Sequence, residues 1–311
     1  MYFPYFRGRQ FELIALRELI NDNLLSSKVI PIIEPVILSS TLLSTMEAFI
    51  DNNRTLGIIC NPEVGKFCLN TDENDERVNK FLQLLKNENI YRTSILNQNN
   101  DEQFEILNED NSSENQNWIV ILNNRDRLDD YNKFNEEKSV KFVLIPDESA
   151  FKRRIDGNKI LFEDRFNKCP RNEDYSINTD EFFSDDHLFY KSEGFQGFGD
   201  YSVIGNIFID SGFAPLAIAI HIVYLTDTNN LKIHHFVSDS NDDRKNPAKK
   251  YYEAVNKLVE WCDLNKIQKT NGLQFFYDCY KEESYHGLGV VKKYSIMHHL
   301  ELISNFLDLE K

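Results

Sequence analysis

Three short apolar runs in the middle of the chain decide the fold: WIVIL at residues 118–122, KFVLI at 141–145 and KILFE at 159–163. Polar segments long enough for short, irregular helices separate them. Strands of a parallel sheet are buried on both faces, so they are continuously apolar and do not alternate with polar residues. The spacing of these runs therefore predicts strand–helix units around a parallel sheet.

The same pattern continues on both sides of these runs. Four earlier strands are predicted at residues 2–6, 29–35, 56–60 and 91–96. An eighth is expected between Leu188 and Ile204. We therefore predict an α/β fold in the form of an irregular TIM-like (β/α)8 barrel. An open doubly wound sheet would produce the same runs and stays an alternative.

The C-terminal third has a different pattern. The runs AIAIHIVYL (217–225) and LKIHHFVS (231–238) flank the polar residues DTNN, which predicts an antiparallel β-hairpin. Three helices are expected after it, at about residues 247–265, 271–282 and 291–309. We divide the chain into a barrel at 1–206 and an added region of hairpin and helices at 207–311, packed on the barrel as one compact unit.

Composition limits the classes of function. The 311 residues are 41% hydrophobic, which is enough for a large core and excludes general disorder. Aspartate and glutamate outnumber lysine and arginine, and the net charge is −15. A field of that sign repels nucleic acid and anionic membranes, so neither is an expected partner unless basic groups are concentrated locally.

Targeting signals are not evident in the sequence. The N-terminus has no basic region followed by an apolar run and a cleavage site, and no run of 18 apolar residues occurs. The five cysteines are scattered and form no CxxC pair, so neither a zinc site nor a disulfide framework is indicated. We expect a soluble cytoplasmic protein with free thiols.

Ligands of parallel barrels bind at the carboxyl ends of the strands, which we call the rim. Polar side chains follow nearly every predicted strand: Arg7, Arg9, Glu34, Asn61, Glu63, Asn97, Asn123, Arg125, Asp147, Glu163, Asp164, Arg165, Asp200 and Tyr201. Carboxylates and arginines on one rim suit a metal, a phosphate or a polar substrate. The structural alternative is that strand ends are polar because the chain reaches the surface there.

Glu34 is the most informative single residue, because it lies in the apolar run VIPIIEP between two prolines. A buried carboxylate is costly unless a cation or ligand accompanies it. Arg7 on the neighbouring strand is the expected partner, and a purely structural Arg7–Glu34 pair stays an alternative to a catalytic role.

Two further sets complete the candidate site. Asp164 and Asp200, with Glu34, are candidates to bind a divalent cation such as Mg²⁺ or Mn²⁺, or to share acid–base work. His298 and His299 lie on the last predicted helix and diverge by about 100°, so only one can face the barrel mouth. We take His298 as that acid–base candidate and expect its helix to close over the rim.

The chain resembles the bacterial and phage "beta protein" family. The shared positions are Tyr2, Pro4, Arg7, Gly8, Arg9, Glu12, Pro31 and Glu34 near the start, and Gly199, Asp200, Tyr201, His298 and His299 later. The resemblance implies a TIM-barrel-type fold and a setting in mobile elements or phage defence. It implies no activity, because the family has no settled one.

Two functional hypotheses follow. In the first, the protein is a hydrolase of a phosphoester or related anionic substrate. Catalysis is then assigned to Glu34, Asp164, Asp200 and His298, and substrate binding to Arg7, Arg9, Arg165, Tyr201, Asn123 and Asp147. In the second, it is a non-catalytic sensor or subunit that holds a protein encoded nearby in the same operon. The first predicts convergence in a cleft, and the second predicts a salt-bridged rim with an exposed apolar patch.

Overall fold

The structure is a computed structural model, and it describes residues 1–69, 75–96, 117–210 and 215–309. Of the residues that the sequence singled out, Asn97 lies outside these ranges.

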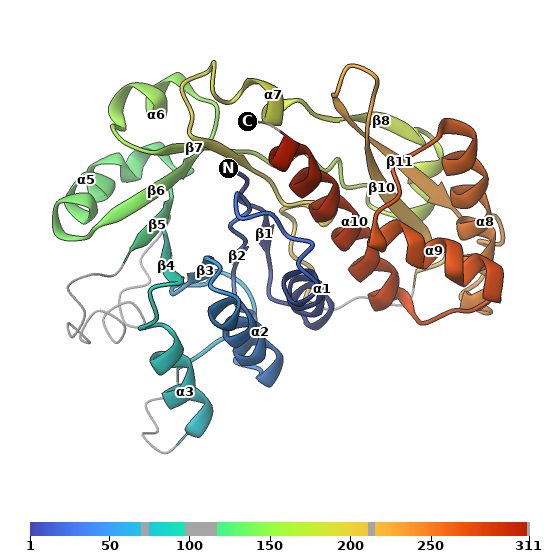
Figure 1. Cartoon of the computed structure of the whole chain (residues 1–311), viewed down its shortest axis with the longest axis horizontal. Helices are drawn as coiled ribbons and strands as arrows, with labels where there is room; N and C mark the ends of the chain where they lie inside the picture. Colours follow the sequence, from blue (N-terminus) through green and yellow to red (C-terminus); the bar gives the residue numbers. More distant parts are fainter. Residues whose placement is uncertain (70–74, 97–116, 211–214, 310–311) are drawn as a thin grey trace.

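Eight parallel strands form a nearly closed barrel and follow one another in chain order (Figure 1). They are β1 (Tyr5–Phe6), β2 (Ile32–Ile33), β3 (Leu56–Ile59), β4 (Ile90–Ile95), β5 (Trp118–Ile121), β6 (Val140–Ile145), β7 (Lys159–Phe162) and β9 (Gly197–Gly199). Every predicted strand is present, so the irregular TIM-like barrel is confirmed.

Backbone hydrogen bonds join the first strand of the barrel to the last. The amide of Phe3 donates to the carbonyl of Phe198 at 2.8 Å, and the amide of Tyr5 donates to that of Asp200 at 2.8 Å. The two segments approach so closely that a Cβ on Gly199 would lie 2.5 Å from the Phe3 carbonyl oxygen. Glycine at this position therefore lets β9 reach the first strand.

The barrel has two apolar layers. Its interior is filled by aromatic and branched side chains, among them Phe3, Ile32, Ile119 and Leu144. The outer layer lies between the strands and the helices α1 (Gln10–Asn21), α2 (Ser40–Asp51), α3 (Glu76–Leu84), α5 (Leu128–Glu137) and α6 (Ser149–Arg154). A 3₁₀ turn, η1 (Arg125–Arg127), precedes α5.

The predicted hairpin and three C-terminal helices are also confirmed. The strands β10 (Ala219–Leu225) and β11 (Leu231–Val237) pair antiparallel, and α8 (Pro247–Asn265), α9 (Asn271–Glu282) and α10 (Leu288–Leu309) follow. A third strand that we did not predict, β8 (Asp180–Ser184), pairs with β11. It follows a short helix, η2 (Asn172–Ser176), and precedes α7 (Asp186–Phe189). The division at residue 206 stays a prediction, and this sheet takes strands from both sides of it.

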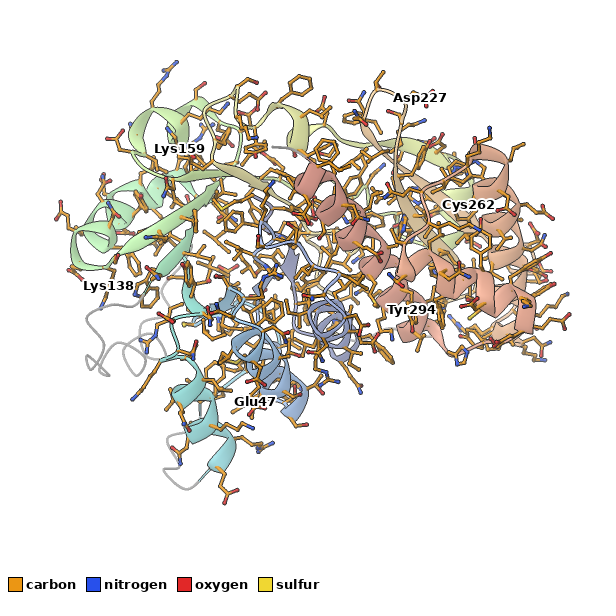
Figure 2. The ribbon with its side chains drawn as sticks, viewed as in Figure 1. Glu47, Lys138, Lys159, Asp227, Cys262 and Tyr294 are labelled. Carbon is orange, nitrogen blue, oxygen red and sulfur yellow. The ribbon has the colours of Figure 1, made fainter. Side chains whose placement is uncertain are left out.

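Helix α10 connects the added region to the barrel, because it packs against α1, α9 and β10 (Figure 1). Lys293 pairs with Glu18 of α1 at 2.7 Å. Tyr294 stacks on Phe275 of α9 with the ring centroids 3.6 Å apart, at the junction labelled in Figure 2. Across the described ranges, no helix has the length and apolar content required to cross a membrane.

Candidate functional site

Arg7 and Glu34 meet at the carboxyl ends of β1 and β2, as expected. The Arg7 guanidinium forms an ion pair with Glu34, whose side chain is fully buried. The Tyr5 hydroxyl donates to Glu34 Oε2 at 2.7 Å, and the backbone amide of Glu63 donates to Oε1 at 2.6 Å. Both carboxylate oxygens are therefore occupied by donors from the protein, which is the arrangement of a structural ion pair.

Aromatic rings fill the barrel mouth around this pair. The Tyr201 ring lies 4.9 Å from Tyr5 and 5.0 Å from Phe162, measured between centroids. The Arg7 guanidinium lies over both tyrosine rings, at 5.0 Å and 5.6 Å. Burial raises the pKa of the Tyr201 hydroxyl, so this phenol stays neutral and provides a packing surface for Arg7.

Residues 204–210, which we call the rim segment, follow β9 and receive three basic side chains. Arg7 Nη2 donates to the carbonyl of Asn206 at 2.6 Å, and Lys168 Nζ donates to that of Ile207 at 2.8 Å. Arg9 donates to the carbonyl of Ile209. These acceptors carry no net charge, so the contacts with the rim segment do not neutralise the three positive charges.

A pocket of about 240 Å³ opens where these side chains meet. Four basic residues line it: Arg7, Arg9, Lys168 and Lys292. Two acidic residues, Glu12 and Asp210, also line it, and the other lining residues all belong to the rim segment. We call this the cationic pocket. Such a concentration of positive charge is unexpected in a chain of net charge −15.

Only part of this positive charge is neutralised. Lys292 pairs with Glu12 at 2.7 Å, and Arg7 pairs with Glu34. Within the described residues, neither Arg9 nor Lys168 has a carboxylate at ion-pair distance. The pKa of Lys168 is lowered by partial burial first and then by its cationic neighbours Lys292 and Arg9. The pocket therefore has a positive field suited to an anion.

Sequence reasoning did not identify Lys168, Lys292 or Asp210. Lys168 lies in the loop after β7, and Lys292 comes from the first turns of α10. The helix does reach the rim, as predicted, but it presents a lysine there rather than a histidine. A lone lysine on a loop or helix is an ordinary surface residue, so no local pattern distinguishes these positions.

The remaining predicted rim residues do not line the cationic pocket. Arg165 forms two hydrogen bonds of 2.7 Å with Asp186. Asp147 pairs with Lys152, and Asn123 is exposed after β5. Asp164 adjoins the rim segment, where Oδ2 accepts from the amide of Asn206 at 2.8 Å. It holds the segment in place, and its charge partly opposes the lowering of the Lys168 pKa.

His298 is not brought to the rim, which corrects its assignment to the site. Its ring is fully buried between α10, α9 and β10, where Nε2 donates to the carbonyl of Val223 at 2.7 Å. Nδ1 accepts from the hydroxyl of Thr270 at 2.7 Å. His299 lies on another side of the helix, 2.9 Å from the hydroxyl of Ser202. Both imidazoles are parts of the core.

Within the portion of the chain that the structure describes, no group of three or more histidine, cysteine, aspartate or glutamate side chains could hold a metal ion. Glu34, Asp164 and Asp200 thus do not form the three-carboxylate cluster considered from the sequence. Asp200 is buried, and its Oδ1 accepts from the Tyr2 hydroxyl and the Ser202 amide, both at 2.7 Å.

The burial of Asp200 predicts a pH-dependent stability, because burial raises the pKa of its carboxyl group to about 7. The folded chain holds a proton that the unfolded chain releases above its ordinary pKa of 3.8. The contribution to stability is therefore greatest at low pH and is lost as pH rises through about 7. Asp200→Asn is expected to gain on the order of 2–4 kcal/mol relative to the parent between pH 4 and pH 8. Urea unfolding at both pH values measures the free energy of unfolding of variant and parent. If the difference between the two proteins is the same at pH 4 and pH 8, the prediction is wrong.

Comparisons of the chain with protein-family models, curated proteins and solved structures returned no match.

Proposed function

We propose that this protein binds a phosphate-bearing small molecule in the cationic pocket and hydrolyses its phosphoester bond. The observation that supports the proposal is the convergence of Arg7, Arg9, Lys168 and Lys292 on one pocket at the carboxyl ends of the barrel strands. Parallel barrels bind their ligands at that end.

The present hydrogen bonds of the pocket explain why an anion would be preferred. Arg9 and Lys168 donate to backbone carbonyls of the rim segment, and those acceptors have no net charge. A phosphate oxygen makes shorter and stronger charge-assisted bonds with the same donors, and a guanidinium can hold two of its oxygens at once. Binding would therefore exchange neutral acceptors for charged ones.

Hydrolysis in this pocket would add water across the phosphorus–oxygen ester bond. The water oxygen becomes bonded to phosphorus, the ester bond breaks, and the departing alkoxide takes up a proton. The basic residues would stabilise the charge that develops on the phosphoryl oxygens. Asp210, an exposed carboxylate in the pocket wall, is proposed to take the proton of the attacking water.

Lys168→Met tests the binding step. The variant keeps an unbranched apolar side chain but removes a charge that has no carboxylate at ion-pair distance among the described residues. We expect inorganic phosphate to bind the parent and to bind the variant about 10- to 100-fold more weakly, because a hydrogen bond to a charged group contributes roughly 1.5–3 kcal/mol. Isothermal titration calorimetry gives both constants.

The matched control is Lys249→Met, which removes the same charge from an exposed position on α8. It should leave phosphate binding unchanged. The proposal fails if phosphate does not bind the parent, or if both variants lose the same affinity. Turnover of p-nitrophenyl phosphate, with and without Mg²⁺ or Mn²⁺, tests the hydrolytic step, and Asp210→Asn should abolish it while phosphate still binds.

A second candidate function is supported by the rest of the rim. Arg165–Asp186 and Arg125–Glu148 are ion pairs, so these two rim arginines have counter-charges within the protein. Ile207 on the rim segment is 56% exposed, as a contact for another protein would be. We propose as the alternative a subunit that holds a protein encoded nearby. A partner co-purifying with the parent but not with Ile207→Ser, while phosphate binding persists, would favour it.

We also propose that the chain belongs to the "beta protein" family and has a role in phage defence. The support for both is the set of sequence motifs around Arg7, Glu34 and Asp200. If the parent gene lowers the number of phage plaques and the Lys168→Met version does not, the cationic pocket is connected to defence.

A further inference from the structure

The cationic pocket adjoins a larger cleft of about 660 Å³. The two share Arg9, Phe208 and Asp210 in their walls, so they are neighbouring parts of one hollow on the rim. The cleft is larger than a phosphate group needs and lies in the range typical of sites for small organic ligands.

We infer that this cleft holds the organic part of the ligand and that the ligand is a mononucleotide, a phosphate ester that carries a flat heterocyclic base. This inference rests on the proposed function, because it places the phosphate in the cationic pocket. Arg9 lies at the boundary between the two spaces, where it would contact the phosphate from the side of the nucleoside.

The walls of the cleft supply an apolar surface for a base. Ile37, in the loop between β2 and α2, is 54% exposed and lines the cleft but not the cationic pocket. Phe208 of the rim segment contributes an aromatic ring, over which the Arg9 guanidinium lies at 4.8 Å. A heterocycle placed against these side chains would bury them, and stacking on an aromatic ring contributes roughly 1–3 kcal/mol per base.

The cleft also offers polar groups that a purely apolar ligand would leave unused. Gln10 at the start of α1 and Thr41 in the first turn of α2 line it. Among the described residues, the Gln10 amide and the Thr41 hydroxyl have no hydrogen-bond partner. They suit the ring nitrogens and exocyclic groups of a base or the hydroxyls of a ribose.

Gly65 maintains the shape of this cleft. A Cβ at Gly65 would lie 2.5 Å from the carbonyl oxygen of Val36, and the residue has a φ of +86°. The amide of Lys66 donates to the same carbonyl at 2.7 Å. These contacts fix the loop after β3 against the loop after β2, so the cleft is preformed.

Calorimetric titration of the full chain with three probes tests the inference: inorganic phosphate, ribose 5-phosphate and adenosine 5′-monophosphate. We expect adenosine 5′-monophosphate to bind at least tenfold more tightly than either of the others. Ile37→Ser should reduce that affinity about five- to tenfold and leave phosphate binding unchanged. Ile177→Ser, at an exposed isoleucine that lines neither pocket, is the matched control and should change neither affinity.

The outcomes separate the two proposals. If phosphate binds and the nucleotide binds no more tightly, the cleft inference is overturned and the proposed function stands. Equal affinity for ribose 5-phosphate and the nucleotide would also overturn it, because the base would then contribute nothing. If none of the three probes binds, the proposed function itself fails.

Discussion

Replacing Glu34 with alanine is expected to lower the free energy of unfolding by about 3–5 kcal/mol. The Glu34 carboxylate is fully buried and accepts from Arg7, the Tyr5 hydroxyl and the Glu63 amide. Its removal leaves the Arg7 guanidinium without its counter-charge and two further donors without an acceptor. Uncompensated buried charge is among the costliest defects of a folded protein. Urea unfolding at pH 7 measures the loss.

The control for Glu34 is Glu148→Ala, which also removes a carboxylate that pairs with an arginine. Arg125 and Glu148 are 65% and 41% exposed, so water replaces the lost contact. This change should cost less than about 1 kcal/mol. Equal losses from the two variants would show that the Arg7–Glu34 pair does not support the fold as described.

Protonation of two buried histidines below pH 6.5 is expected to destabilise the fold, because burial lowers the pKa of His298 to about 4 and of His299 to about 3. An imidazole with a lower pKa in the folded chain takes up a proton on unfolding at any pH between the two values. Stability is therefore intact above the ordinary pKa of 6.5 and falls as pH drops below it. The loss is on the order of 3 kcal/mol for His298 alone by pH 4.

This prediction is best measured in the Asp200→Asn background, because Asp200 titrates in the opposite sense over the same range. His298→Gln keeps a donor for the Val223 carbonyl and removes one of these titrations. It should therefore reduce the slope of unfolding free energy against pH between 6.5 and 4, and the slope that remains comes from His299 and the other buried histidines. His286→Gln, at an exposed position, is the control. A slope as steep in the His298 variant as in its Asp200→Asn parent would contradict the assignment.

The fold could be predicted from the sequence because each barrel strand can be recognised from its own short stretch of residues. Runs such as WIVIL are apolar throughout since both faces of the strand are buried. The strand β8 was missed because it has no such continuous apolar run. Its sequence DEFFS is short and mostly polar at its start, and only its pairing with β11, far along the chain, makes it a strand.

The candidate site could be predicted only in part. The Arg7–Glu34 pair was predictable, because a carboxylate inside an apolar run must find a cation on a neighbouring strand. The cationic pocket was not, because Lys168 and Lys292 are far apart in sequence and each is unremarkable alone. His298 was misplaced, since helical periodicity gives the angle between two residues but not the partner that each side faces.

Joining the N-terminal segment to β9 has a consequence for synthesis of the chain. Phe198, the hydrogen-bond partner of Phe3, is synthesised nearly two hundred residues after it. At about 5–20 residues per second, the first strand waits on the order of 10–40 s for that neighbour. During that interval its edge is unpaired and open to other nascent chains. Slow translation before Phe198 should therefore favour aggregation, and a chaperone that covers the first strand should prevent it.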